Sequence, residues 1–175
     1  MFVATGPVLG IDPGLTRCGY AVIGTSPNGA PEARSLGVIR TPVHDDLARR
    51  LAALQTEIDS LLDEFAPSAV AIERVFFQVN VRTAMSVGQA SGVVLAAVAR
   101  RGVPVEQYTP TQVKSSVAGD GAADKSQVQK MVQMRLRLSR PPSPADAADA
   151  AAIALCHLAS APLQQRLHAA TGRRP

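Results

Sequence analysis

The sequence predicts an α/β protein whose five-stranded mixed sheet has helices packed on it. Three observations predict this class. Short apolar runs separated by turn residues open the chain as an antiparallel meander over 8–12, 18–23 and 33–39. Two later apolar runs, 69–72 and 103–108, each follow a helical pattern, which indicates parallel crossover strands. Helices are expected over 46–65, 81–100, 110–117, 124–136 and 145–163.

Composition narrows the class further. A chain of 175 residues with 46% hydrophobic content favours one globular domain, expected over 1–163, followed by a disordered basic tail over 164–175. No apolar run reaches membrane-spanning length, and the first residues lack the pattern of a signal peptide. Two distant cysteines imply no disulfide framework, so we expect a cytoplasmic protein. A net charge of +4 is compatible with an anionic partner.

The helix expected over 81–100 carries small residues four positions apart. These are Ala84, Gly88, Gly92 and Ala96, which lie on one helical face. Small side chains let another backbone approach closely. The pattern therefore predicts tight packing of this face on the sheet or on a symmetry mate.

Two acidic residues end apolar strands. Asp12 follows the first strand and precedes a Pro-Gly turn, and Glu73 follows the fourth strand. Sites in α/β proteins are built at strand ends. Asp12 also has a structural interpretation, because Asp before Pro-Gly often bonds its own turn.

Two more acids share one face of the last helix. Asp146 and Asp149 are three residues apart. Asp146 has a structural explanation, since it stands three residues after Ser143, at capping-box spacing. Asp149 lies beyond the first turn and is flanked by alanines, so capping explains it less well.

The four acids together suit divalent-metal chemistry. Like charges close together are costly unless something neutralises them, and Mg²⁺ prefers oxygen ligands. Two such ions roughly 4 Å apart activate a water and stabilise a leaving oxygen on phosphorus. The spacing along the chain leaves open whether Asp12, Glu73, Asp146 and Asp149 converge.

Four other residues are candidates for nucleic-acid contact. Phe76 and Phe77 follow Glu73 in a connection, where one ring could stack on bases or pack against the next helix. Lys125 stands at a helix N-terminus, where a cation opposes the dipole, and Lys114 lies on a short basic helix. Both lysines would suit phosphate binding, and both are equally explained as solvated surface charges.

Six stretches in order resemble the RuvC family of bacterial Holliday-junction resolvases. They are LGIDPG with the later GY, GVIRT, AIERVFF, GQASGV, QVKSSVAGDGAADKSQVQKMV and DAADAAAIA. The first alone is shared with many RNase H-like and actin-like proteins, whereas the ordered set is specific. The likeness covers nearly the whole chain. Arg74 and the second phenylalanine, Phe77, depart from the family pattern and leave open which ring reaches DNA.

The resemblance implies an RNase H-like fold with helices on both faces of the sheet. It implies a homodimeric endonuclease of recombination and repair that nicks two opposed strands of a four-way DNA junction and leaves 5′-phosphates. Mg²⁺ or Mn²⁺ is the implied cofactor, two ions per site, and the RuvA–RuvB branch-migration complex is an expected partner. Family catalytic and metal-binding acids carry over to Asp12, Glu73, Asp146 and Asp149, although some relatives have His at the position of Asp146. The DNA-contacting aromatic carries over to Phe76, with Phe77 beside it, and the phosphate-contacting lysines carry over to Lys114 and Lys125.

Three other functions remain open at this point. An actin-like ATPase or sugar kinase needs a second nucleotide-binding half, which 175 residues do not hold. An RNase H-like nuclease of the YqgF type would act on RNA. A non-catalytic DNA-binding subunit on the same fold has no need of all four acids.

Overall fold

A computed structural model gives the fold and describes residues 6–74 and 81–171, with side chains described for 6–74 and 84–161. The five strands lie in the order β3-β2-β1-β4-β5. Their bounds are β1 Val8–Asp12, β2 Arg17–Thr25, β3 Pro31–Arg40, β4 Ala69–Glu73 and β5 Val105–Tyr108. β1 pairs antiparallel with β2 and β2 with β3, whereas β1–β4 and β4–β5 are parallel. The predicted mixed sheet is confirmed.

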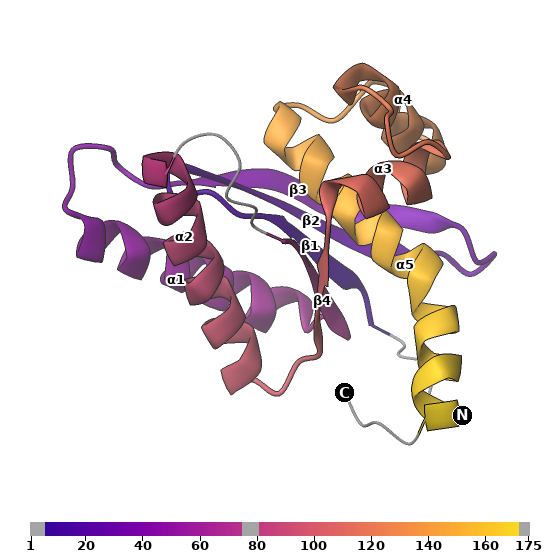
Figure 1. Cartoon of the computed structure of the whole chain (residues 1–175), viewed down its shortest axis with the longest axis horizontal. Helices are drawn as coiled ribbons and strands as arrows, with labels where there is room; N and C mark the ends of the chain where they lie inside the picture. The colour runs from indigo at the N-terminus through magenta and orange to yellow at the C-terminus, as the bar shows by residue number, and fades with distance from the viewer. Residues whose placement is uncertain (1–5, 75–80, 172–175) are drawn as a thin grey trace.

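Helices cover both faces of this sheet (Figure 1). Their bounds are α1 Leu47–Phe65, α2 Val81–Arg100, α3 Pro110–Ala118, α4 Lys125–Arg135 and α5 Ala145–Thr171. One core lies between the sheet and α1 with α2, and the other lies between the sheet and α5 with α3 and α4. No helix in the described ranges is both long and apolar enough to cross a bilayer.

The α1 helix follows its sequence pattern closely. Asp46 is its N-cap, and the Asp46 carboxylate accepts a hydrogen bond from the backbone N–H of Arg49. Its apolar stripe, with Leu54 and Ile58 fully buried, faces the sheet. Burial of each such side chain contributes about 1.5–3 kcal/mol before entropy is counted.

Several element boundaries differ from the sequence prediction, and two of the differences have a clear physical cause. β5 begins at Val105 rather than at 103, because Pro104 has no N–H to give to the sheet and only its carbonyl bonds Val70. α5 runs to Thr171 rather than ending near residue 163. Residues 164–171 are mostly good helix formers, and Gly172 is the first strong breaker after them.

Candidate active site

Asp12 and Glu73 stand side by side at one edge of the sheet. β1 and β4 are parallel neighbours in which Ile11 pairs with Ile72, so the next residue of each strand is an acid. Adjacent strands are about 4.8 Å apart. Ile11 and Ile72 are buried against α1 and α2. Because side chains alternate along a strand, both carboxylates face the opposite side, where α5 lies.

The α5 helix is seated on that face through two glycines. A Cβ added to Gly10 of β1 would lie 2.2 Å from the carbonyl oxygen of Ala150, and one added to Gly19 of β2 would lie 2.1 Å from that of Asp146. The helix backbone therefore occupies space that any larger residue would fill. This close approach carries Asp146 and Asp149 to the edge that holds Asp12.

The carboxylates interact electrostatically across these elements. Burial raises the pKa of Asp12 to about 7, and the negative charges of Glu73, Asp149 and Asp146 add to the effect. Burial also raises the pKa of Glu73, with a further contribution from Asp149. Strand-end turn bonding does not explain such a shift. The structure thus brings all four acids into one negative cluster.

Two cations bind the α5 carboxylates. Lys125 Nζ donates to Asp149 Oδ2 at 2.6 Å, and this hydrogen bond raises the pKa of Lys125. Arg17 Nε donates to Asp146 Oδ2 at 2.9 Å, and the Arg17 NH2 group donates to the same oxygen. The bond from Arg17 lowers the pKa of Asp146. The Asp146 side chain therefore pairs with β2, which the capping-box interpretation did not anticipate.

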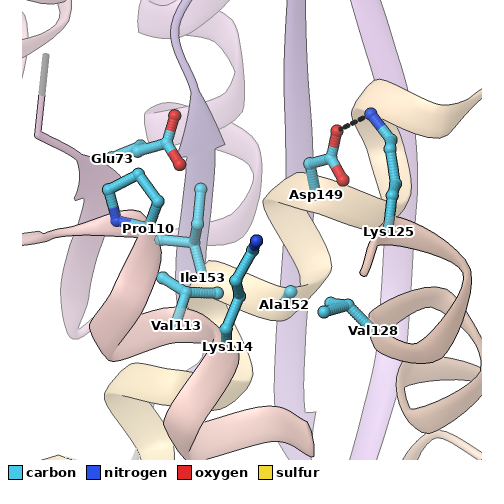
Figure 2. Close-up of a pocket in the computed structure, with 9 residues that line it drawn as sticks. All are labelled: Glu73, Pro110, Val113, Lys114, Lys125, Val128, Asp149, Ala152 and Ile153. Carbon is cyan, nitrogen blue, oxygen red and sulfur yellow. Dashed lines mark hydrogen bonds and ion pairs between the residues drawn. The ribbon is translucent and has the colours of Figure 1, made fainter. Parts of the chain in front are cut away.

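A pocket of about 290 Å³ opens beside this cluster. Four charged residues line it, Glu73, Lys114, Lys125 and Asp149. Five apolar residues complete the lining, Pro110, Val113, Val128, Ala152 and Ile153. Figure 2 shows the Lys114 ammonium pointing into the space between Glu73 and Asp149. Acids from the sheet and α5 therefore meet cations from α3 and α4 in one concavity.

The donor set suits a hard divalent cation, because it consists of carboxylate oxygens gathered near the half-buried Asp12. Within the described part of the chain, no three Asp, Glu, His or Cys side chains are arranged to hold a metal ion as they stand. Arg17 and Lys125 instead engage two of the four carboxylates. A divalent ion here would take over the neutralising role of these cations, and the residues present fit such an ion.

Comparison with known proteins decides the family. The family model for the crossover junction endodeoxyribonuclease RuvC matches residues 8–157. The chain belongs to the RuvC family. The RuvC of Streptomyces avermitilis is 51% identical over 172 residues, which cover 95% of this chain and 98% of that one. RuvC enzymes are divalent-metal-dependent crossover junction endodeoxyribonucleases, and this chain has that activity.

Solved RuvC structures have the same fold. Thermus thermophilus RuvC superposes with a TM-score of 0.84 at 38% identity, over 90% of this chain and 96% of that one. The same protein in complex with a Holliday junction substrate superposes with a TM-score of 0.85 at 37% identity, over 91% and 96% of the two chains. The expected RNase H-like α/β architecture is therefore confirmed.

The structure groups most of the residues that the sequence predicts for a site, and it adds Arg17 to them. The structure brings Asp12, Glu73, Asp146 and Asp149 to one edge and places Lys114 and Lys125 in the adjoining pocket. Phe76 and Phe77 lie outside the described residues. Arg17 was not singled out by the sequence. The pattern that could have identified Arg17 is the two-residue alternation of side chains along β2, which puts Arg17 on the same face as Gly19.

Proposed function

We propose that this RuvC-family chain resolves four-way (Holliday) junctions in DNA recombination and repair by paired, symmetric nicks in two opposed strands. Each nick is a divalent-metal-dependent hydrolysis that leaves a 5′-phosphate. The observation that carries the proposal is the gathering of four carboxylates from β1, β4 and α5, with the half-buried Asp12 among them. The Thermus RuvC solved with a Holliday junction supports the choice of substrate.

In this proposal Asp12, Glu73, Asp146 and Asp149 are the catalytic carboxylates and the ligands of two ions, Mg²⁺ or Mn²⁺. Bound ions supply Lewis acidity and a hydroxide nucleophile at neutral pH. Asp12 and Glu73 are held by paired strands, and Asp146 and Asp149 by a helix seated on those strands. Ligands on such rigid elements keep their geometry while substrate enters.

Lys114 and Lys125 complete the site as phosphate-binding cations. Both line the pocket between Glu73 and Asp149, where a scissile phosphate would bring negative charge against the carboxylates. Lys125 already bonds Asp149, so it is placed to bridge a ligand and a phosphate oxygen. Positive charge at this position offsets the charge that develops on phosphorus in the transition state.

The proposed DNA contacts include Phe76 and Phe77, which follow Glu73 by three and four positions. An aromatic ring there is close in sequence to the catalytic edge and could stack on unpaired bases near the crossover. Phe76→Ala and Phe77→Ala, compared on junction binding, identify which ring makes this contact.

We also propose that the active form is a homodimer whose two sites meet the two opposed strands. The small residues of α2 support this, since a Cβ added at Gly88 or Gly92 would meet no atom within 4 Å among the residues that the structure describes. α2 buries a different face, with Ala90, Val94 and Val98 in the core. The small-residue face is therefore left for a second copy. Further parts of the proposal are association with the RuvA–RuvB complex and a single nuclease domain over 1–163, followed by a basic tail over 164–175 whose first part continues α5 as far as Thr171. We place the enzyme in the cytoplasm, which the free, buried Cys18 and Cys156 support.

The proposal is tested by cleavage of a synthetic four-way junction in Mg²⁺. Asp149→Asn is expected to keep the fold and junction binding and to abolish nicking, because the amide is a poor ligand for a hard cation. Asp63→Asn is the matched control, since Asp63 is an exposed acid that forms an ion pair with Arg101, the residue that follows α2. Robust nicking by purified Asp149→Asn protein would contradict the proposal, and so would equal losses in the two variants.

A further inference from the structure

The Arg17–Asp146 pair is the strongest ionic contact at this edge that the proposed mechanism does not use. Arg17 Nε and NH2 both donate to Oδ2 of Asp146, so one carboxylate oxygen takes two charge-assisted hydrogen bonds. Solvent reaches this pair only in part, because the side chain of Arg17 is 37% exposed and that of Asp146 is 27% exposed. A divalent ion that needs Oδ2 must therefore compete with a guanidinium already bound there.

The fold holds Arg17 in this position. Arg17 begins β2 and shares a face with Gly19, whose missing side chain makes room for the Asp146 backbone. The Arg17 carbonyl oxygen lies 2.2 Å from where a Cβ on Gly14 would stand, so the turn after Asp12 packs directly on it. Arg17 is consequently held by β2 and by the turn after Asp12, and Asp146 is held by α5. Few rearrangements could separate Arg17 from Asp146 other than rotation of the arginine side chain.

Basic side chains are already bonded to both α5 carboxylates. Asp146 bonds Arg17, Asp149 bonds Lys125, and no three of the described acidic, His or Cys side chains are set to hold a metal. We propose that Arg17 is a positioning residue that serves as the resident counter-ion of Asp146 and must release it before Asp146 binds a divalent cation. This inference rests on the proposed function in taking Asp146 as a metal ligand.

The proposal makes a signed prediction about metal affinity. Removing the Arg17 charge takes away the competitor, so divalent cations should bind more tightly. The pair also offsets repulsion among four acids, so its loss should destabilise the metal-free protein. A residue that only oriented Asp146 would give the opposite result for affinity, because its loss would leave the ligand misplaced.

The test is a Mn²⁺ titration of the full chain, with free Mn²⁺ followed by electron paramagnetic resonance. Arg17→Gln is expected to lower the Kd by up to about fivefold, which corresponds to the ~1 kcal/mol upper value for a partly exposed ion pair. Arg17→Lys keeps the charge and should stay within about twofold of the unmodified chain. Arg49→Gln is the matched control, because Arg49 pairs with Asp46 at the exposed start of α1.

Outcomes of this titration separate the two proposals. An unchanged or raised Kd for Arg17→Gln overturns the role of Arg17, as does an equal gain in Arg49→Gln. Arg17→Met gives a second neutral variant if the Gln variant fails to fold. Failure of the unmodified chain to bind Mn²⁺, or binding that Asp149→Asn leaves intact, would instead overturn the metal site itself.

A second readout separates counter-ion from scaffold. In chelator, Arg17→Gln is expected to lower the Tm, and saturating Mn²⁺ should restore it to that of the unmodified chain. The Mg²⁺ concentration for half-maximal junction cleavage should fall by the same factor as the Kd. A Tm loss that persists with bound metal would assign Arg17 a purely structural role.

Discussion

Gly10→Ala tests whether the seating of α5 on β1 sets the geometry of the active site. The added Cβ would lie 2.2 Å from the Ala150 carbonyl oxygen and 2.9 Å from the Ala154 Cβ. Real Cβ contacts essentially never fall under 3.0 Å, so the helix must withdraw by at least about 0.8 Å. Neither neighbour can rotate away, since one is backbone and the other is a Cβ.

Two consequences of this displacement can be estimated. Overpacking at a well-packed contact costs about 1–3 kcal/mol of unfolding free energy, which a urea titration measures. Asp149 lies one residue before Ala150 and would move with the helix. A misplacement of about 1 Å in a catalytic group costs about 100-fold in rate, so junction cleavage should fall by that order while the chain remains folded.

Gly24→Ala is the control for this experiment. The three atoms nearest its Cβ would all belong to the Arg34 guanidinium, with Nε at 2.4 Å, and this flexible side chain can rotate away. We expect near-unchanged stability and cleavage for this variant. The reasoning is refuted if Gly10→Ala cleaves junctions as fast as the unmodified chain, or if both glycine variants lose activity equally.

Four further predictions follow, three from the charges at the site and one from a contact between Tyr108 and His157. In chelator, the free energy of unfolding should decline as pH rises from 3.8 to about 7, because the folded state favours protonated Asp12 over that range. Thermal melts at a series of pH values check this, and a Tm that does not change with pH would count against it. Metal affinity should rise with pH up to about 7 for the same reason, as calorimetric Mn²⁺ titrations would show. Lys125→Met removes a charge that lowers the pKa of Asp12, so it should move that rise in affinity to higher pH, and no movement would argue against the coupling. Tyr108→Phe deletes the 2.9 Å hydrogen bond between its hydroxyl and His157 Nδ1. The free energy of unfolding, measured by urea titration, should fall by about 1 kcal/mol, and metal affinity should not change.

Local sequence patterns predicted much of this site because its acids break those patterns. Asp12 and Glu73 end strands that are otherwise buried, and the strand period determines which face they occupy. Asp149 interrupts a run of buried alanines, which also marks it without reference to the fold. Such signals arise within a few residues, so an isolated sequence contains them.

The pairing of Arg17 with Asp146 could not be predicted in the same way. The two residues are 129 positions apart, and their contact depends on α5 crossing β2 at Gly19. The sequence offers a local explanation for Asp146, as a capping residue, that is chemically reasonable and differs from its observed partner. The packing of α5 on the sheet decides between these two explanations, because it brings the positively charged Arg17 side chain within hydrogen-bonding distance of Asp146.

The composition of α5 follows from this seating. Between Ala147 and Cys156, α5 is covered by the sheet on one side and by α3 and α4 on the other, so this stretch is buried around most of its circumference and is largely apolar. Six alanines between 147 and 154 keep it thin enough to fit, and Ile153 and Leu155 fill what remains. The acids stand in the first turns of this helix, where Lys125 and Arg17 reach them. Packing of the helix and charge balance of the site are thus coupled, because any change that lifts α5 also separates its carboxylates from both cations.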